Sequence, residues 1–187
     1  MSIKRIGKNQ IDLIRDVALI VWPATFGEIL SEKQLNFMME MMYSKNSLEK
    51  QFDDGHEFYL YYEENQAIGF LGIELNYQGK EQLKIHKLYV LPSIQKKGIG
   101  KQFIDFAEKR CKELKCPLLT LNVNRYNKAV GFYEKLQFNC TKSEDIHIGK
   151  GYLMDGKESY EWHPNILHFL LGFSRVFLNH VLQFLQV

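Results

Sequence analysis

The chain has 187 residues, of which 45% are hydrophobic and 25% charged, and its formal net charge is +2. This is the composition of an ordinary folded domain with a core of its own, and so small a net charge excludes a general electrostatic attraction to nucleic acid or to a membrane surface. The three cysteines are odd in number and lack metal-ligand spacing. They argue against a disulfide framework and against a metal site, so we expect a reducing, cytoplasmic location.

The beginning of the chain predicts a short strand and two amphipathic helices. Residues 2–6 can form the strand, and Asn9 can cap a helix whose apolar residues recur at helical spacing. We expect Pro23 to interrupt this helix, because proline removes a backbone donor and crowds the preceding turn. Ser31 is a second N-cap, for a helix within residues 31–44. This beginning lacks the apolar core of a signal peptide.

The middle of the chain changes from helical periodicity to alternation. In order, it predicts strands at 58–62, 67–75 and 83–91, a helix at 100–115, a strand at 117–123, a helix at 127–136 and an extended segment from Phe138. Short polar turns between the first three of these strands favour antiparallel pairing. The fold class that follows is α/β of the α+β kind, with helices packed on a mixed, mostly antiparallel sheet.

The segment LPSIQKKGIGKQF, residues 91–103, joins a predicted strand to a predicted helix. Pro92 ends the strand, and Gly98 and Gly100 permit positive φ and close approach to the backbone. The helix then begins with unpaired N–H groups, which together with the helix dipole favour an anion. Three lysines add positive charge: Lys96, Lys97 and Lys101. The segment therefore predicts a phosphate or pyrophosphate site, although its spacing fits neither a P-loop nor a dinucleotide fold. A glycine-rich surface turn is the alternative.

Three motifs occur in the order and at the spacing of a known family. They are Leu88-Tyr89-Val90-Leu91-Pro92, then Gln95-Lys96-Lys97-Gly98-Ile99-Gly100, and then Asn127-Lys128-Ala129-Val130-Gly131-Phe132-Tyr133-Glu134-Lys135-Leu136-Gln137-Phe138. Together they resemble the GCN5-related N-acetyltransferase (GNAT) superfamily, over about residues 3–154. Only Gln137 departs from the third motif, where a glycine that ends the helix is usual. Residues 24–44 resemble the start of small bacterial acetyltransferases related to the polyamine acetyltransferase PaiA.

The resemblance implies acetyl-CoA as co-substrate, bound where the sheet splays between the strand at 83–91 and the strand at 118–123. Main-chain groups of Leu88 and Val90 would pair with the pantetheine arm, and backbone amides from Gln95 to Lys101 would hold the pyrophosphate. The residues that the resemblance places at the cofactor are Leu88, Tyr89, Val90, Gln95, Lys96, Lys97, Gly98, Ile99, Gly100, Lys101, Asn122, Asn127 and Tyr133. For Asn127, a helix N-cap is the alternative.

The resemblance also implies direct attack of a neutral amine on the thioester, without a covalent enzyme intermediate. Tyr133 would protonate the departing thiolate, because a phenol with a pKa of about 10 can donate to a thiol whose pKa is about 8.5. His86 would accept the amine proton, since an imidazole pKa of about 6.5 suits proton transfer at neutral pH. We expect His86 to alternate in phase with Leu88 and Val90. The alternatives are a core aromatic for Tyr133, a structural strand histidine for His86, and a water chain as the base.

The acceptor would be a small primary amine, such as a polyamine, or a peptide N-terminus. Its pocket would be walled by the first two helices and their connection, where Trp22, Phe26 and Glu28 are candidates. Glu28 or Glu74 could attract a cationic amine, and a solvated charge is the alternative for each. The second hypothesis for the whole chain is a non-catalytic acyl-CoA-binding module, or a regulatory or interaction protein on the same fold.

The end of the chain leaves the family pattern at Gly156. We therefore expect an acetyltransferase domain at residues 1–154, an atypical apolar tail at 155–187, and no complete last strand. Apolar residues of the tail recur at helical spacing: Ile166, Leu170, Phe173, Phe177, Val181 and Phe184. Polar residues such as Arg175 interrupt this run, which argues against a transmembrane span. A helix that forms a homodimer or lies on a membrane interface and a shifted reading frame are the open hypotheses.

Overall fold

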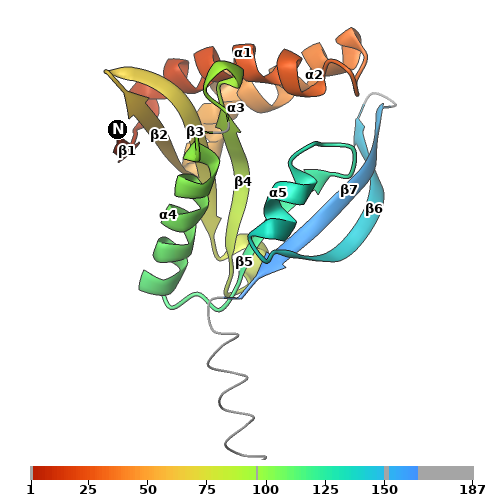
Figure 1. Cartoon of the computed structure of the whole chain (residues 1–187). Helices are drawn as coiled ribbons and strands as arrows, with labels where there is room; N and C mark the ends of the chain where they lie inside the picture. Colours follow the sequence, from red (N-terminus) through yellow and green to blue (C-terminus); the bar gives the residue numbers. More distant parts are fainter. Residues whose placement is uncertain (1, 96, 150–151, 164–187) are drawn as a thin grey trace, which may run out of the picture.

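Seven strands form one sheet, in the order β1-β2-β3-β4-β5-β7-β6 (Figure 1). The computed structural model describes residues 2–95, 97–149 and 152–163. The strands are β1 (Ser2–Arg5), β2 (Glu57–Glu63), β3 (Gln66–Leu75), β4 (Leu83–Val90), β5 (Leu119–Asn124), β6 (Asn139–Gly149) and β7 (Tyr152–Trp162). The α-helices are α1 (Ile11–Phe26), α2 (Glu32–Tyr43), α3 (Lys45–Asp53), α4 (Ile99–Glu113) and α5 (Val130–Lys135), and the short 3-10 helices are η1 (Lys8–Gln10), η2 (Tyr77–Gly79) and η3 (Pro92–Ile94).

The predicted fold class is confirmed, because the described sheet is antiparallel at every pairing except that of β4 with β5. Helices cover both of its faces (Figure 1). On one face, Phe103 of α4 contacts Tyr61 of β2, with ring centroids 5.8 Å apart. On the other, Phe52 of α3 contacts Phe58 of β2 at 4.9 Å. Phe58 and Tyr61 differ in parity along β2, so they point to opposite faces, and both are fully buried.

The first helix does not stop at Pro23, contrary to the prediction. α1 continues to Phe26, and Pro23 lies inside it. The bond that proline removes is the one to the carbonyl of the residue four positions earlier, Leu19. Pro23 is exposed and the side chain of Leu19 is 59% exposed, so water can satisfy the freed carbonyl. Because this face of α1 is exposed, the lost hydrogen bond does not leave a buried polar group without a partner.

The expectation of a missing last strand is also wrong. β7 runs from Tyr152 to Trp162 and lies between β5 and β6, pairing with both. Gly156, where the sequence pattern changes, takes the left-handed region with φ 71° and accepts a hydrogen bond from the backbone N–H of Arg125 at 2.6 Å. This irregular position is absorbed by register shifts against β6, and the strand then continues with Tyr160 buried.

The sheet thus extends beyond residue 154. The division of the chain into a domain and an apolar tail stays a prediction, because residues 164–187 lie outside those that the structure describes. Within the described ranges, none of the helices has both the length and the apolar character needed to cross a membrane.

Candidate functional site

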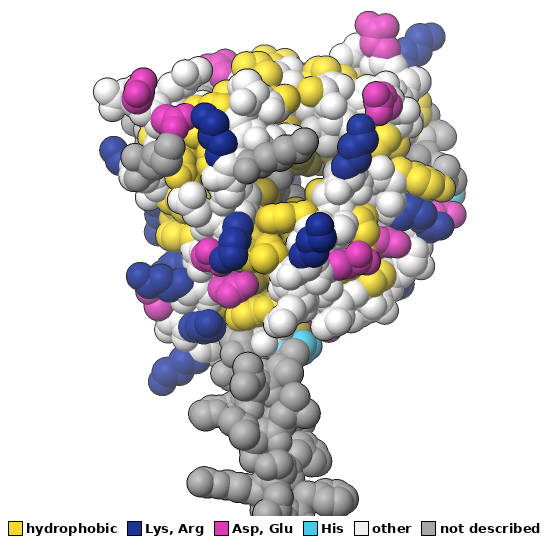
Figure 2. All heavy atoms as spheres, in the orientation of Figure 1, with side chains coloured by type: hydrophobic (Ala, Val, Ile, Leu, Met, Phe, Trp, Pro, Cys, Tyr) yellow, Lys and Arg dark blue, Asp and Glu magenta, His cyan; other side chains and the backbone are white. Residues whose placement is uncertain are grey.

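β4 and β5 are paired along only part of their length. The parallel ladder begins at Leu83 and Leu119 and ends at Ile85 and Leu121, although β4 continues to Val90. Figure 1 shows the two strands diverging beyond this point, and Figure 2 shows hydrophobic side chains in a hollow of the surface on this side of the molecule. The predicted splay between these two strands is therefore present.

A β-bulge in β4 lies where this divergence begins. Ile73 of β3 lies opposite Ile85, whereas its neighbour Gly72 lies opposite Lys87, so His86 is an extra residue on β4. An extra residue changes the parity of everything that follows it. After His86, a side chain that would have faced one side of the sheet faces the other, and a backbone group that would have pointed to one edge of β4 points to the opposite edge.

The bulge leaves the backbone of Leu88 and Val90 directed towards the opening. Leu91 donates its N–H to the carbonyl of Ile68, beside β3, at 2.9 Å. Backbone groups alternate in direction along a strand, so those of Leu88 and Val90 point away from β3, to the side where β5 has diverged. Leu88 and Val90 thus lie on a strand edge with which none of the described strands pairs, and an extended ligand can pair with it.

The loop after β4 brings the N-terminus of α4 beside this edge. Gly98 is the N-cap, with φ 79° and ψ 5°, and a Cβ there would meet nothing within 4 Å. The left-handed conformation, rather than lack of space, therefore requires glycine. A Cβ at Gly100 would lie 3.3 Å from the ring of Phe132, so α4 and α5 approach closely here. Gln95 donates its Nε2 amide to the carbonyl of Val90 at 3.2 Å, which ties the loop to the strand edge.

The lysines of this loop differ in their surroundings. Lys97 is exposed, whereas Lys101 pairs with Asp105 at 2.7 Å on the surface of α4. Lys96 lies outside the described residues. Ile99 is buried and anchors the first turn of α4. Backbone amides at this helix N-terminus, with Lys97 beside them, are thus the groups that can receive an anion.

α5 carries Tyr133, which is 8% exposed. Burial and the nearby Tyr89 raise the pKa of the Tyr133 phenol above its ordinary value, so the hydroxyl keeps its proton at neutral pH. The helix ends with Gln137 at φ 66°, and the N–H of Phe138 donates to the carbonyl of Tyr133 at 3.1 Å. This is the 6→1 bond of a Schellman motif, in which glycine is usual at the left-handed position.

The two predicted asparagines make local contacts. Asn127 Oδ1 accepts a hydrogen bond from the backbone N–H of Ala129 at 2.8 Å, just before α5. Asn127 is therefore not the N-cap of α5, which is Ala129; its Oδ1 closes a turn ahead of the helix, and its Nδ2 amide is the group left for a ligand. Asn122 is exposed on β5, and its Oδ1 accepts from Lys84 Nζ at 2.7 Å.

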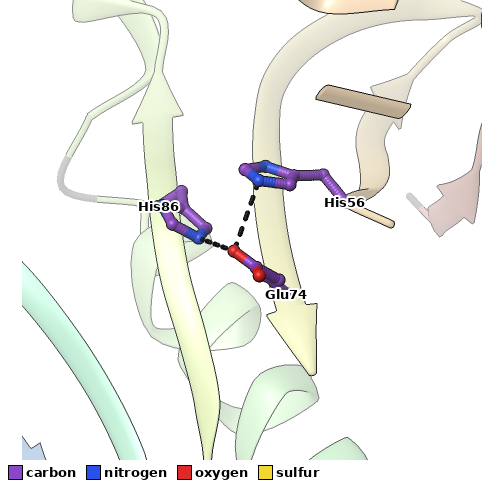
Figure 3. A group of neighbouring side chains, drawn as sticks. All are labelled: His56, Glu74 and His86. Carbon is purple, nitrogen blue, oxygen red and sulfur yellow. Dashed lines mark hydrogen bonds and ion pairs between the residues drawn. The ribbon is translucent and has the colours of Figure 1, made fainter. Parts of the chain in front are cut away.

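His86 does not share a face with Leu88 and Val90, contrary to the prediction. Because it is the bulged residue, its side chain lies on the sheet face of Glu74 and His56, away from α4. His86 Nε2 is 2.7 Å from Glu74 Oε2, and His56 Nε2 is 3.3 Å from the same oxygen (Figure 3). The two imidazole rings stack, with centroids 4.4 Å apart and planes at 22°.

Both imidazoles of this His–Glu–His cluster are held neutral. Burial, with His56, Lys87 and Lys84 nearby, lowers the pKa of His86 to about 3. Burial and Lys87 lower the pKa of His56 to about 4, while burial raises the pKa of Glu74. A carboxylate oxygen only accepts, so neutral His86 donates its Nε2–H to Glu74, while His56 Nε2 lies 3.3 Å from the same oxygen. Sequence reasoning found Glu74 and His86 separately and missed His56, for which no motif spacing gives a signal.

Two buried lysines beside this cluster were also missed. Lys87 Nζ donates to Gln51 Oε1 at 2.6 Å and lies 5.6 Å from the ring centroid of Tyr43. Burial lowers the pKa of Lys87 to about 8, and burial with the nearby Lys157 lowers that of Lys84 to about 8. The signal in the sequence is the presence of two lysines within a mainly apolar strand, LKIHKLYV.

The other predicted acceptor residues fall into two groups. Trp22 is 2% exposed and donates its Nε1–H to the Tyr43 hydroxyl at 3.0 Å, and the rings of Phe26 and Tyr89 are tilted against it with centroids at 4.6 Å and 6.1 Å. These rings form the core beneath the α1–α2 connection. Glu28 is instead 87% exposed and pairs with Lys128 at 3.5 Å, just before α5. The connection between α1 and α2 therefore lies close to the residues that precede α5.

A family model described as an acetyltransferase (GNAT) domain matches residues 27–151. Among curated proteins, an uncharacterized N-acetyltransferase from Bacillus velezensis is 34% identical over 89 residues, which is 48% of each chain. Another, from Lactobacillus delbrueckii subsp. lactis, is 28% identical over 116 residues, covering 58% of this chain and 67% of the relative. The chain thus spans about half the length of the first of these relatives.

Two solved structures are similar in fold. The PaiA N-acetyltransferase from Thermoplasma acidophilum, in complex with coenzyme A, has a TM-score of 0.70 and 24% identity, covering 87% of this chain and 100% of that one. The ribosomal-protein-S18-alanine N-acetyltransferase from Escherichia coli has a TM-score of 0.67 and 11% identity, covering 87% and 92%. At these identities the likeness establishes a shared fold.

Proposed function

Because the chain belongs to the GNAT acetyltransferase family, we propose that it is an N-acetyltransferase that transfers the acetyl group of acetyl-CoA to a primary amine. The observation that carries this proposal is the end of the β4–β5 ladder at Ile85. It leaves the backbone of Leu88 and Val90 facing an opening, beside a helix N-terminus capped by Gly98. An extended amide-containing arm with a pyrophosphate at one end matches both features.

Coenzyme A has this form. Its pantetheine arm would pair with the backbone of Leu88 and Val90 as an added strand, and its pyrophosphate would accept hydrogen bonds from the amides of the loop and of the first turn of α4. Asn127, through its Nδ2 amide, would contact the arm from the opposite side of the opening. The thioester would then lie towards the point where β4 and β5 meet.

The reaction requires two proton transfers. The amine nitrogen attacks the thioester carbonyl, a C–N bond forms, and the C–S bond breaks with release of the thiolate. Tyr133 would give its proton to the thiolate, and burial keeps that phenol protonated until the thiolate forms. On the other face of the sheet, neutral His86 is the candidate acceptor of the amine proton, with Glu74 stabilising the imidazolium that results, although a pKa lowered to about 3 makes His86 a weaker base than a free imidazole. A water chain to solvent is the alternative base.

The acceptor would enter from the sheet face that holds Glu74 and His86. We propose that the acceptor is a small amine such as a polyamine, or a peptide N-terminus. Two proteins with the same fold are a PaiA N-acetyltransferase and a ribosomal-protein-S18-alanine N-acetyltransferase. Glu28, near the entrance, could attract a cationic acceptor. We also propose a cytoplasmic location, because Cys111, Cys116 and Cys140 are all free thiols.

Thiol release with a panel of amines tests the proposal. Acetyl-CoA is supplied with polyamines, aminoglycosides and short peptides with free N-termini, and coenzyme A is detected by a thiol reagent. With an accepted amine, Tyr133→Phe should lower kcat by roughly 10²- to 10⁴-fold, the usual contribution of a general acid, while the KM for acetyl-CoA changes little. Tyr126→Phe is the matched control, because Tyr126 is 61% exposed.

The non-catalytic alternative predicts another outcome of the same experiment. If acetyl-CoA binds in calorimetry but no amine of the panel releases thiol, the chain acts as an acyl-CoA-binding module. Equal kcat values for Tyr133→Phe and the wild type would show that Tyr133 is not the general acid. They would not contradict the transfer reaction itself.

A further inference from the structure

We propose that His56, Glu74 and His86 bind a divalent transition-metal ion such as Zn²⁺. This inference goes beyond acetyl transfer, and it departs from the expectation that no metal is involved. Two imidazoles and one carboxylate are a recurring ligand set for such ions, with a remaining position for water. The three side chains come from different parts of the chain, namely the segment before β2, the end of β3 and the bulge in β4.

The spacing of the donor atoms fits one small ion. Ligand atoms of the three residues all lie within 4.8 Å of one another. Zinc takes bonds of about 2.0–2.1 Å to imidazole and carboxylate, so two neighbouring donors of a tetrahedron are about 3.3 Å apart. His56 Nε2 and Glu74 Oε2 are separated by 3.3 Å, and His86 Nε2 and Glu74 Oε2 by 2.7 Å. The shorter pair has to open by a few tenths of an ångström for an ion to enter, and the two imidazole donor atoms lie within 4.8 Å of each other.

The cluster is also chemically ready for a cation. A metal binds the neutral form of imidazole, and both rings lie mostly buried beside a carboxylate that an ion can share with them. For an ion to bind both Nε2 atoms, the protons on these nitrogens move to Nδ1, which is a change of tautomer. Asp54 adds negative potential to His56 and Glu74. The three side chains are 13–21% exposed, which gives an ion a path from solvent.

Two features set the expected affinity. Lys87 and Lys84 lie close enough to lower the pKa of His86, and their positive charge also opposes a cation. His56 Nδ1 is buried without a hydrogen-bond partner among the described residues, whereas a metal-bound histidine usually donates its second N–H to a carbonyl or carboxylate. We therefore expect micromolar affinity for Zn²⁺, typical of an exchangeable ion, instead of the tighter binding of a structural zinc.

Metal binding has a consequence for the proposed reaction. An ion at this cluster occupies the Nε2 lone pair of His86 and fixes Glu74, so neither can take part in moving the amine proton. Zn²⁺ should therefore inhibit acetyl transfer, and a chelator that removes the ion should restore the activity. This consequence rests on the proposed function, whereas the binding itself does not.

Direct titration tests the site without any acetyl transfer. Untagged full-length protein, freed of metal by a chelator and dialysed, is titrated with ZnCl₂ in a calorimeter, and CoCl₂ is added to a second sample to record the visible spectrum of bound Co²⁺. One equivalent of Zn²⁺ should bind, and His56→Ala or His86→Ala should each weaken it by roughly 10- to 100-fold or more. His163→Ala is the matched control, since its side chain is 46% exposed outside the cluster.

Further controls address folding and stray ligands. Glu74→Gln keeps the shape of the side chain and should also lose affinity, so loss does not depend on a variant that fails to fold. Cys140→Ser removes the exposed thiol and should bind like the wild type. MgCl₂ should give no saturable heat, because imidazole ligands do not suit Mg²⁺.

The proposal is overturned if Zn²⁺ gives no saturable binding, or if His56→Ala and His86→Ala bind it as the wild type does. These results would leave acetyl transfer untouched, because thiol release is measured separately. Conversely, a protein that binds Zn²⁺ at this cluster but releases no thiol with any amine would disprove the proposed function alone.

Discussion

Replacement of Gln137 by glycine should stabilise the protein. Gln137 takes φ 66° where α5 ends, and its side chain is exposed. The backbone around it is held by two hydrogen bonds, from Gln137 N–H to the carbonyl of Glu134 at 2.9 Å and from Phe138 N–H to the carbonyl of Tyr133 at 3.1 Å. The helix end therefore keeps the left-handed geometry of a glycine cap although the residue is not glycine. Glycine would adopt that geometry without strain.

The expected gain is the difference of two terms. A residue with a Cβ loses roughly 1–2 kcal/mol in the left-handed region. Glycine loses about 0.4–1 kcal/mol more conformational entropy on folding. The exposed side chain of Gln137 contributes little packing, so Gln137→Gly should raise the free energy of unfolding by about 0.5–1 kcal/mol. For a chain of this size, that is a rise in Tm of roughly 1–4 °C.

Urea denaturation followed by circular dichroism measures the gain, with the thermal midpoint as a second readout. Lys115→Gly is a replicate, since Lys115 has φ 53° and Cys116 N–H donates to the carbonyl of Cys111 in the same 6→1 pattern. Lys109→Gly is the matched control inside α4, where glycine should cost about 1 kcal/mol. Destabilisation by Gln137→Gly as large as that of Lys109→Gly would refute the strain argument.

Three further predictions concern glycines and a buried lysine. Gly98→Ala should weaken the binding of coenzyme A, measured by calorimetry, by up to roughly tenfold, because a residue with a Cβ loses about 1–2 kcal/mol in the left-handed conformation of this cap. An unchanged affinity would contradict a role for this cap. Lys87→Met should stabilise the protein at pH 7. The folded pKa is lowered to about 8 from 10.5, so the cost of burying the charge is present below pH 8 and vanishes above the unfolded pKa; the gain should therefore shrink between pH 8 and 10.5, and a constant gain argues against this origin. Gly156→Ala should cost about 1–3 kcal/mol, since a Cβ at φ 71° would lie 1.9 Å from Arg125 Nε; combination with Arg125→Ala should recover only the steric part.

Much of the fold could be predicted because its elements follow local rules. Ser31, for example, accepts a hydrogen bond from the N–H of Gln34 at 3.3 Å, as its N-cap position predicts. The rules failed where distant partners or solvent decide. Pro23 is tolerated because its neighbouring carbonyl faces water, and the strand after Gly156 forms because β5 and β6 flank it on both edges. Neither the solvent nor the partner strands can be read from the local sequence.

The two halves of the candidate site were predictable to different degrees. The donor half consists of backbone groups within one strand, one loop and one helix start, so a continuous motif around Gly98 describes it. The face with His56, Glu74 and His86 is assembled from three elements that are far apart in the sequence. Histidines 30 positions apart carry no common pattern, and only the pairing of β3 with both β2 and β4 brings them onto one carboxylate.

The bulge at His86 links these two halves. Before it, the N–H of Leu83 donates to Leu118 on the β5 side at 2.9 Å, so odd-numbered backbone groups face β5. After it, the even-numbered Leu88 and Val90 face that side. Without the extra residue, strict alternation would direct Leu88 and Val90 into the ladder with β3 and leave other backbone groups at the opening. The same insertion keeps His86 and Lys87 both on the face opposite α4, where one contacts Glu74 and the other Gln51. Removing one residue from β4 would therefore disturb the cofactor edge and the His–Glu–His cluster together, whereas a side-chain change at His86 should affect the cluster alone.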